Sequence, residues 1–277
     1  MHYSFNNVAS GLNLLTLTDY GLDYVRFLLS NSNKLPSKEL SRIFKDVMTL
    51  SLNKGGLIIE NLPKEIEPSV ALKAFGMLMA QPVQYRYQGP LVMNITPDKS
   101  KEGLGAASNT CHYFDPHTDL SYVKQPPDIV GLYVVRQDID KQSRSLFCNI
   151  STVVSSLNTE ILEELLKPKY TFNPPSHYKK RTRIIVPILT PTKTGFGFRF
   201  RKDILLANDE PSRFAVECLY NKMISNMIEF YAKEGSIIFL NNKISAHGRT
   251  AFRPSYDAKD RLLKRIFFVV KGKTVCV

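Results

Sequence analysis

The chain has 277 residues, of which 43% are hydrophobic and 22% charged, and this ordinary globular balance excludes wholesale disorder. At about 150 residues per domain, the length corresponds to one large domain or two small ones. The apolar runs, such as residues 266–270, are much shorter than the roughly 20 residues that span a bilayer, and residues 1–7 have no basic segment leading into an apolar one. We therefore expect neither a membrane helix nor a secretory leader.

Positive charge is concentrated in one stretch of the chain. Lysine and arginine number 37 against 25 aspartate and glutamate, which gives a net charge of +12. Residues 165–202 contain ten basic residues and no acidic one. Such a run is most often a solvated basic surface. The alternatives are a surface for an acidic substrate, an acidic partner protein or nucleic acid.

The cysteines exclude the commonest thiol-based sites. Cys111, Cys148, Cys218 and Cys276 are widely separated and form no Cys-x-x-Cys pair. A zinc knuckle or a thioredoxin-type site therefore has no support. So few cysteines indicate reduced thiols and a cytoplasmic protein.

The first third of the chain predicts mixed helix and strand. A helix is expected to begin at about Ser37. Its apolar residues recur at helical spacing: Leu40, Ile43, Phe44, Val47 and Met48. A buried strand is expected at 55–63, then a helix capped by Ser69, and then a strand at 91–96 that leads into a polar loop at 97–108.

The rest of the chain predicts mainly strands. They are expected at 129–136, 145–150, 183–189, 235–240 and 262–270. Residues 197–201 alternate strictly between apolar or small residues and arginine, which would place Arg199 and Arg201 on the same side of a strand.

One long helix is expected at about 211–233. Its predicted buried face carries Phe214, Cys218, Met223, Met227 and Phe230. Strands with one helical excursion favour a mainly β fold, a sandwich or barrel with helices packed outside.

A histidine and an aspartate two residues apart form the first candidate site. In Phe-Asp-Pro-His-Thr-Asp, on extended backbone, His117 and Asp119 point the same way and can hold one metal ion. With a third ligand they would form a facial triad, whose open positions suit non-haem Fe(II) oxygen chemistry. His-x-Asp alone is a weak signal that occurs by chance, and an ordinary hydrogen-bonded pair is then the better explanation. The third candidate is His247, after an expected strand and turn, whereas His112 has no obvious partner spacing.

Two arginines follow the distant histidine. Arg261 lies 14 residues after His247, and Arg265 lies four further on, on the same face of the last expected strand. Buried guanidinium groups need anionic partners, and a dicarboxylate cosubstrate could satisfy one of them through bidentate hydrogen bonds. The alternative is a structural ion-pair network with Asp257 and Asp260. The combined order His-x-Asp, distant His, Arg is more specific than any of its parts.

Two blocks of the sequence resemble a known family. Residues 113–137, which end in Pro-Asp-Ile-Val-Gly-Leu-Tyr-Val-Val-Arg-Gln, and residues 246–265, which begin with Ala-His-Gly-Arg-Thr-Ala-Phe-Arg-Pro, are similar to the clavaminate synthase-like Fe(II)/2-oxoglutarate oxygenases. These belong with the taurine dioxygenase superfamily and include free amino-acid hydroxylases. The resemblance extends to residues 56–63 and 91–97, so it spans most of the chain. It implies a double-stranded β-helix, or jelly roll, with the metal at its mouth.

The resemblance also implies roles for individual residues. His117, Asp119 and His247 would be the Fe(II) ligands and the catalytic centre. Arg261 would bind the distal carboxylate of 2-oxoglutarate, and Ser145 would add a hydroxyl at a position where threonine is more usual.

Substrate recognition would involve further arginines. Arg265 matches the position that contacts the substrate carboxylate in the amino-acid hydroxylases. Many of those enzymes carry His-x-Glu where this chain has Asp119, although aspartate is normal across the wider superfamily. Relatives that bind basic amino acids place acidic groups roughly where this chain has residues 196–202, with Arg199 and Arg201. We therefore expect these arginines to face an acidic or neutral substrate, free or bound to a carrier protein, rather than lysine or arginine. The alternative is that both arginines point outward and serve only solubility.

The sequence thus predicts an Fe(II)- and 2-oxoglutarate-dependent dioxygenase that uses dioxygen to hydroxylate or desaturate an unactivated C–H of a small molecule, in particular an amino acid or its derivative. A single domain would span residues 1–277, with a helical and mixed part at about 1–90 and a jelly-roll core at about 91–277 that carries an insertion at about 151–182. Halogenation is disfavoured because Asp119 fills the position that a halide would need.

Two alternatives remain open. A nucleic-acid-directed 2-oxoglutarate oxygenase would explain the basic stretch, but that stretch has few aromatic residues on which bases could stack. A non-catalytic jelly-roll binding protein would explain the scaffold, but it would not need the complete set of candidate ligands. The sequence indicates neither the substrate's identity nor the oligomeric state.

Overall fold

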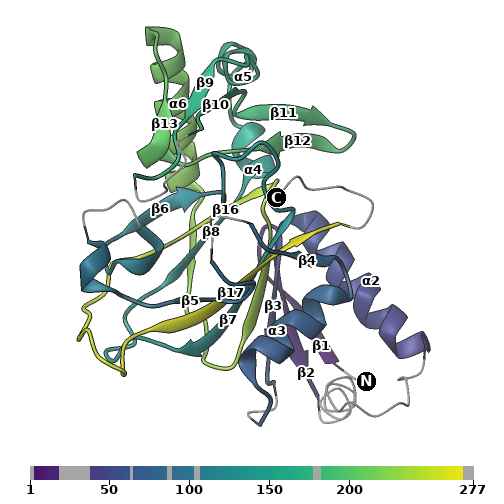
Figure 1. Cartoon of the computed structure of the whole chain (residues 1–277). Helices are drawn as coiled ribbons and strands as arrows, with labels where there is room; N and C mark the ends of the chain where they lie inside the picture. The colour runs from purple at the N-terminus through teal and green to yellow at the C-terminus, as the bar shows by residue number, and fades with distance from the viewer. Residues whose placement is uncertain are drawn as a thin grey trace.

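The computed structural model describes residues 3–18, 38–62, 65–85, 89–102, 107–176 and 182–270, and two β-sheets organise this part of the chain (Figure 1). The larger sheet contains β1 (Tyr3–Ala9), β2 (Leu12–Leu17), β3 (Gly56–Glu60), β4 (Gln81–Val83), β5 (Met93–Ile95), β7 (Ile129–Arg136), β15 (Ile237–Asn241) and β17 (Leu262–Val269). Its order is β1-β2-β3-β15-β7-β17-β4, with β5 paired to β17. Only the pairing of β2 with β3 is parallel among these described strands.

The smaller sheet faces the larger one across the core. It contains β6 (Phe114–His117), β8 (Ser145–Asn149), β14 (Ile228–Phe230) and β16 (Ser245–Arg249), in the order β14-β8-β16-β6. Together the two sheets form the jelly roll that the family resemblance implies.

Most of the predicted strands are confirmed. The strand at 129–136 matches β7 over its whole length, and β3, β5, β8, β15 and β17 match their predictions with shifted or shorter ends. The strand predicted at 183–189 is wrong, because the run divides into β10 (Ile184–Val186) and β11 (Leu189–Thr192). Pro187 lies in the gap, where its missing N–H cannot contribute to a ladder.

Strand β15 shows how the larger sheet is buried on both faces. Ile238 and Leu240 pack into the cluster between the two sheets, whereas Ile237 and Phe239 pack into the cluster on the opposite face. This alternation follows from the two-residue period of a strand. Because both faces are covered, the strand is apolar along nearly its whole length. Its inner face contributes apolar side chains to the space between the sheets.

Two helices cover the outer face of the larger sheet (Figure 1). The predicted first helix is confirmed as α2 (Lys38–Lys54), although Ser37 itself lies outside the described residues. In α3 (Pro68–Met77) the predicted cap at Ser69 is wrong. The Glu67 side chain accepts the hydrogen bond from the Val70 N–H at 2.9 Å. Pro68 lacks an N–H and fits the first helical position, so the residue before it becomes the cap.

The helix predicted at 211–233 is shorter than expected. It is α6 (Glu210–Ser225), and the apolar residues that follow form β14, which pairs with β8 in the smaller sheet. The predicted buried face is also wrong in part, because Phe214 is 63% exposed. The residues that α6 buries have true helical spacing: Ser212, Ala215, Val216, Leu219 and Met223.

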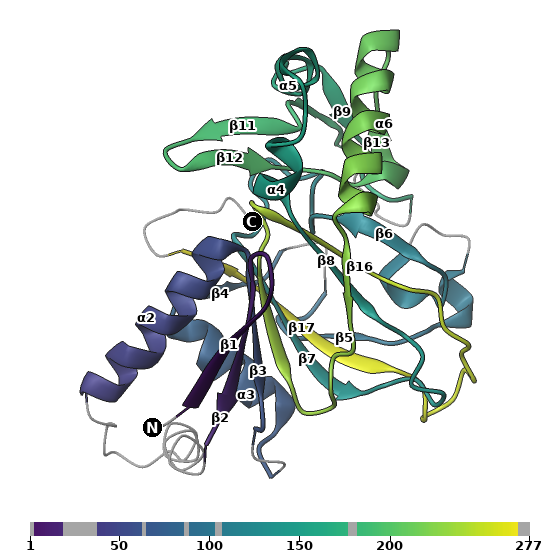
Figure 2. The ribbon, with the colours of Figure 1, turned by 180° about the vertical axis from the view of Figure 1, so that it is seen from behind.

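A group of helices and short strands lies together at one end of the two sheets, at the top of Figures 1 and 2. It contains α4 (Ile150–Val154), α5 (Thr159–Leu165), β9 (Tyr170–Phe172), β10, β11, β12 (Gly195–Phe198), β13 (Leu205–Leu206) and α6. We call these elements the end unit. The insertion expected at about 151–182 covers the first three of them, and the others also lie outside the two large sheets.

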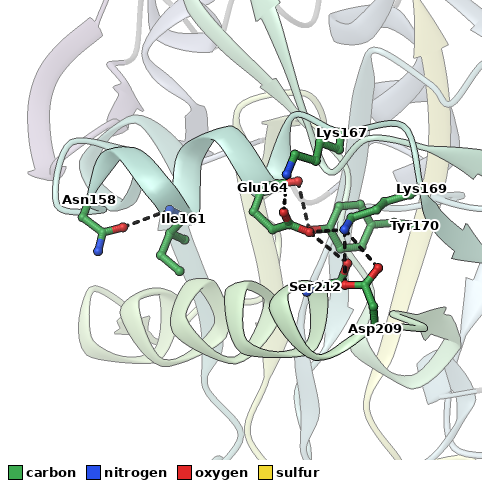
Figure 3. Close-up of polar contacts among 8 residues, drawn as sticks. All are labelled: Asn158, Ile161, Glu164, Lys167, Lys169, Tyr170, Asp209 and Ser212. Carbon is green, nitrogen blue, oxygen red and sulfur yellow. Dashed lines mark hydrogen bonds and ion pairs between the residues drawn. The ribbon is translucent and has the colours of Figure 1, made fainter.

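A buried carboxylate connects the parts of the end unit (Figure 3). Glu164 on α5 is 6% exposed, and its side chain accepts hydrogen bonds from Lys167 at 2.8 Å and from the Ser212 hydroxyl of α6 at 3.0 Å. Lys169 pairs with Glu164 and also, at 3.0 Å, with Asp209, which caps α6. Four charged groups and a hydroxyl thus connect α5 to the start of α6.

No described helix is long and apolar enough to cross a membrane.

Candidate active site

Three potential metal ligands meet at the mouth between the two sheets. His117, Asp119 and His247 each offer a ligand atom, and these atoms all lie within 4.8 Å of one another. The His247 Nε2 atom lies 3.4 Å from Asp119 Oδ2, and the two imidazole ring centres lie 4.4 Å apart. The structure therefore brings together the three residues that the sequence singled out as a triad.

Strand pairing positions the two histidines. His117 is the last residue of β6 and stands opposite His247 of β16 in the antiparallel register. The strands approach closely beside this pair, because a Cβ on Gly248 would lie 2.4 Å from the Phe114 carbonyl oxygen. A residue with a side chain at that position would push β16 away from β6 and separate the imidazoles.

Asp119 is held by an asparagine rather than by strand geometry. Strand β6 ends at His117, so Asp119 lies in the turn that follows and not on continuous extended backbone. The Asn242 side chain, 2% exposed, accepts a hydrogen bond from the Asp119 N–H at 2.8 Å. Its amide group donates to the Asp119 and Pro127 carbonyl oxygens, both at 3.0 Å. Asn242 belongs to the turn before β16, so it connects the Asp119 segment to the strand that carries His247.

The state of the ligand atoms fits a divalent cation. Burial, and next the neighbouring His247, lower the pKa of His117 well below its ordinary value, which favours the neutral imidazole that binds metals. Its Nδ1 atom lies 2.8 Å from the Asp115 carbonyl oxygen, so a proton on Nδ1 leaves Nε2 free for a metal. Burial acts to raise the pKa of Asp119, but the Arg265 guanidinium and the His247 imidazole outweigh it and lower that pKa. Asp119 Oδ2 is buried and accepts no hydrogen bond, as expected for an atom that faces a cation.

Two buried arginines face the same cavity without a carboxylate partner among the described residues. Arg261 is 5% exposed and Arg249 is 6% exposed, and the Nε atoms of both lack a hydrogen-bond acceptor. Burial, and then the charge of Arg249, lower the pKa of Arg261. Two adjacent buried cations are costly unless an anion neutralises them. The pair therefore fits a carboxylate ligand such as the distal end of a dicarboxylate.

The alternative ion-pair network for Arg261 is not formed within the described parts of the chain. The Asp260 carboxylate instead accepts hydrogen bonds from the backbone N–H groups of Ser255 and Tyr256, at 2.8 and 2.6 Å. Asp257 accepts hydrogen bonds from the Ser255 hydroxyl and the Lys259 N–H. Both aspartates stabilise the loop before β17 and leave Arg261 for the cavity.

Arg249 was not identified from the sequence. It lies two residues after His247 on β16, so both side chains are on the same face of the strand. The two-residue spacing from His247 is the sequence feature that could have identified Arg249. Ser145, the predicted hydroxyl, stands directly opposite Arg249 in the pairing of β8 with β16.

Arg265 contacts the candidate metal ligand itself. Its Nη1 atom donates a hydrogen bond to Asp119 Oδ1 at 3.1 Å, and the side chain is buried. The same side chain lines the cavity, as Asp119 does.

The cavity has an empty volume of about 620 Å³ that includes open solvent. Its lining combines polar and apolar side chains. Its polar lining comprises Ser108, His117, Asp119, Ser145, His247, Arg249, Arg261 and Arg265. The apolar lining comes from both sheets and includes Leu132, Leu146, Ile238, Leu240 and Leu263.

The other two predicted arginines do not share a strand face, because β12 ends at Phe198. Arg199 donates hydrogen bonds to the carbonyl oxygens of Ser121 at 2.8 Å and Val123 at 2.6 Å, so it supports the segment after Asp119. Arg201 pairs with Asp203 at 2.8 Å, and its guanidinium lies 5.4 Å from the centre of the Phe114 ring. Arg201 is thus close to the metal cluster, whereas Arg199 has a structural role at the backbone.

Comparison with known proteins identifies the family. Residues 30–267 match the model of the taurine catabolism dioxygenase TauD, TfdA family. The chain is 21% identical to an L-lysine 3-hydroxylase of Catenulispora acidiphila over 86% of its own length and 74% of that protein. It is 25% identical to an L-asparagine oxygenase of Streptomyces coelicolor over 65% of its length, a match that spans 54% of that protein.

Solved structures agree with this fold. An asparagine oxygenase in complex with Fe(II), 3-hydroxyasparagine and succinate superposes with a TM-score of 0.81 at 18% identity, covering 92% of this chain and 93% of that one. The non-heme iron oxygenase OrfP in complex with Fe and alpha-ketoglutaric acid superposes with a TM-score of 0.77 at 20% identity, covering 92% and 93%.

Proposed function

The chain belongs to the TauD, TfdA family and is an Fe(II)- and 2-oxoglutarate-dependent dioxygenase, and from this premise we propose that it hydroxylates the carbon skeleton of a free amino acid. The observation that carries the proposal is the joint lining of one cavity by a two-histidine, one-carboxylate cluster and by buried arginines without carboxylate partners. Relatives named as lysine and asparagine oxygenases support an amino-acid substrate.

In this proposal one group of residues holds the metal ion and another binds the cosubstrate. His117, Asp119 and His247 would hold Fe(II), which together with 2-oxoglutarate and dioxygen supplies the oxidising power for an unactivated C–H. Arg261 and Arg249 would bind the distal carboxylate of 2-oxoglutarate through charge-assisted hydrogen bonds.

Ser145 and Arg265 would have two further roles, the first toward the cosubstrate and the second toward the metal ligand and the substrate. Ser145, opposite Arg249, would add a hydroxyl to the cosubstrate's carboxylate. Arg265 would keep Asp119 ionised and orient it toward the metal, and its guanidinium would also attract the substrate's carboxylate.

We further propose that the substrate's side chain is neutral or acidic. Asp119 is the one acidic residue among the described residues of the cavity lining, and it already pairs with Arg265. A cationic side chain would meet three arginines there and no second carboxylate among the described lining residues, and like charges disfavour binding. One relative is named for lysine and another for asparagine, so their names do not decide the charge of the substrate. The proposal of a neutral or acidic side chain therefore rests on the cavity lining.

A screen of the common amino acids tests both statements. The protein would be loaded with Fe(II) and 2-oxoglutarate without oxygen, and each amino acid would be added while the melting temperature is measured, because stabilisation follows ligand affinity. With oxygen, the expected result is succinate release coupled to loss of one neutral or acidic amino acid. Turnover of lysine or arginine would disprove the charge proposal alone, and no response to any amino acid would disprove the amino-acid proposal.

A further inference from the structure

A second group of potential metal ligands lies outside the cavity. Glu102, Cys111 and His112 offer a carboxylate oxygen, a thiol sulfur and an imidazole nitrogen, and these atoms lie within 4.8 Å of one another. They belong to the segment that precedes β6, on either side of residues 107–109. We propose that this group, the Cys111 cluster, is an accessory binding site for Zn²⁺.

The donor set of the Cys111 cluster suits zinc. Zn²⁺ accepts sulfur, nitrogen and oxygen ligands, and three protein ligands leave a fourth position for water. With zinc bonds of about 2.0–2.3 Å, tetrahedral geometry places ligand atoms about 3.3–3.8 Å apart. The Cys111 sulfur already lies 3.9 Å from the Glu102 carboxylate oxygen. His112 is exposed, so its imidazole has room to close the remaining distance.

A tyrosine supports the carboxylate of the cluster. The Tyr256 hydroxyl donates a hydrogen bond to Glu102 and lies 3.9 Å from the Cys111 sulfur. Ligating carboxylates in metal sites are characteristically oriented by such an outer partner.

The backbone of the cluster is fixed in advance by a different part of the chain. The Cys111 carbonyl oxygen accepts a hydrogen bond from the Phe252 N–H at 3.0 Å. The His112 carbonyl oxygen accepts one from the Arg249 guanidinium at 2.8 Å. The backbone of Cys111 and His112 is therefore already in place for a metal ion to bind.

The Cys111 cluster differs from the other thiols of the described chain. Cys148 is buried between the sheets, and burial raises its pKa to about 12, so it is inert toward metals. Cys218 is half-buried on α6 and belongs to no group of metal ligands among the described residues. Cys218 therefore provides a matched control.

The test uses a protein in which the first cluster is disabled. In the His117→Ala/His247→Ala double variant we would measure Zn²⁺ affinity by competition with a chromophoric chelator, and record the absorption of Co²⁺ in its place. We expect one Zn²⁺ per chain and a thiolate-to-cobalt charge-transfer band. Adding Cys111→Ser should abolish the band and weaken Zn²⁺ binding at least 10-fold, whereas adding Cys218→Ser should change neither.

Two further variants guard against a folding defect at the Cys111 thiol, which is buried. His112→Ala and Glu102→Gln change a more exposed imidazole and a carboxylate, and each should weaken Zn²⁺ binding at least 10-fold with the melting temperature retained. Absence of the cobalt–thiolate band in the double variant would overturn the proposal. Equal Zn²⁺ affinity with and without His112 would also overturn it. Because the histidines of the first cluster are absent throughout, the outcome is independent of the proposed hydroxylase function.

Discussion

At the scale of single residues, two adjacent buried cations, Arg261 and Arg249, are the strongest indication of an anion-binding site. Burying these two like charges is unfavourable, and a carboxylate bound between them would offset the free energy that their burial costs. Arg249 also donates to the His112 carbonyl oxygen, so Arg261 has more of its donors free for the ligand. Its planar fork matches a carboxylate, which a lysine ammonium does not.

We therefore predict that Arg261→Lys raises the KM for 2-oxoglutarate, with little change in Fe(II) affinity. Loss of a charge-assisted bidentate pair should cost about 1.5–3 kcal/mol, or roughly 10- to 150-fold in affinity. Initial rates of succinate formation at varied 2-oxoglutarate measure the change. Arg213→Lys, at an exposed position of α6, is the control. An unchanged KM in Arg261→Lys would transfer the role to Arg249 or Arg265.

Asn242 contributes to the site without touching the cavity. Its three hydrogen bonds fix the backbone on both sides of the Asp119 segment, and all of them are buried. Replacing the side-chain amide with a carboxylate would keep the acceptor for the Asp119 N–H. It would remove the donors to the Asp119 and Pro127 carbonyl oxygens.

We predict that Asn242→Asp weakens Fe(II) binding by about 10- to 100-fold, the range for lost outer partners of a metal site. Anaerobic Fe(II) titration, at a temperature where the variant is folded, measures the effect. Asn226→Asp is the matched control, because Asn226 also donates to a backbone carbonyl oxygen, that of Lys222, but at the far end of α6. If both variants lose stability equally and neither loses Fe(II) affinity, Asn242 has only a structural role.

At the scale of elements, Glu164 determines how α5 and α6 pack. The hydrogen bonds from Lys167 and Lys169 are the main causes of its lowered pKa. A lowered carboxyl pKa means that the ionised form is preferred in the folded state. Its contribution to stability is therefore present above the ordinary value of 4.5 and is lost as the pH falls through the lower folded-state pKa.

We predict that Glu164→Gln lowers the free energy of unfolding by about 1–3 kcal/mol at pH 7, because a buried hydrogen-bonded charge is removed. The difference from the wild type should shrink as the pH falls below 4.5. Urea unfolding at several pH values measures both. Glu160→Gln, at an exposed position in the first turn of α5, is the control. A difference that stays constant down to the acid limit would show that the charge of Glu164 is irrelevant.

At the scale of the whole molecule, much of the basic stretch has partners. Lys167 and Lys169 pair with Glu164, Arg201 pairs with Asp203, and Lys202 pairs with Glu217 at 3.1 Å. Residues 179–181, also basic, lie outside the described chain. The described charges therefore act mainly within the end unit, which favours a small-molecule substrate over nucleic acid.

The features that the sequence predicted are those with local signals. Strand β7 has an uninterrupted apolar run, and His117 with Asp119 has a two-residue spacing that a family resemblance reinforced. The end of α6 was misplaced because its apolar residues continue into β14, where a strand partner determines the structure.

The features that the sequence did not predict depend on contacts between distant segments. Arg249 and Asn242 acquire their partners only when segments from different parts of the chain come together, and the Cys111 cluster acquires its tyrosine partner in the same way. Tyr256 lies 154 residues from Glu102 along the chain, and no spacing rule relates them. Local patterns can identify a ligand, but the residues that orient it come from the tertiary fold.

The central claim is that His117, Asp119 and His247 together hold the iron. Anaerobic Fe(II) titration of the wild type and of His117→Ala, Asp119→Ala and His247→Ala tests it most directly, with Asp140→Ala, at an exposed aspartate, as the control. We predict one Fe(II) per chain in the wild type and in the control. We predict binding weakened more than about 10-fold in each of the other three variants, with loss of turnover. Wild-type affinity in any one of those three variants would contradict the triad.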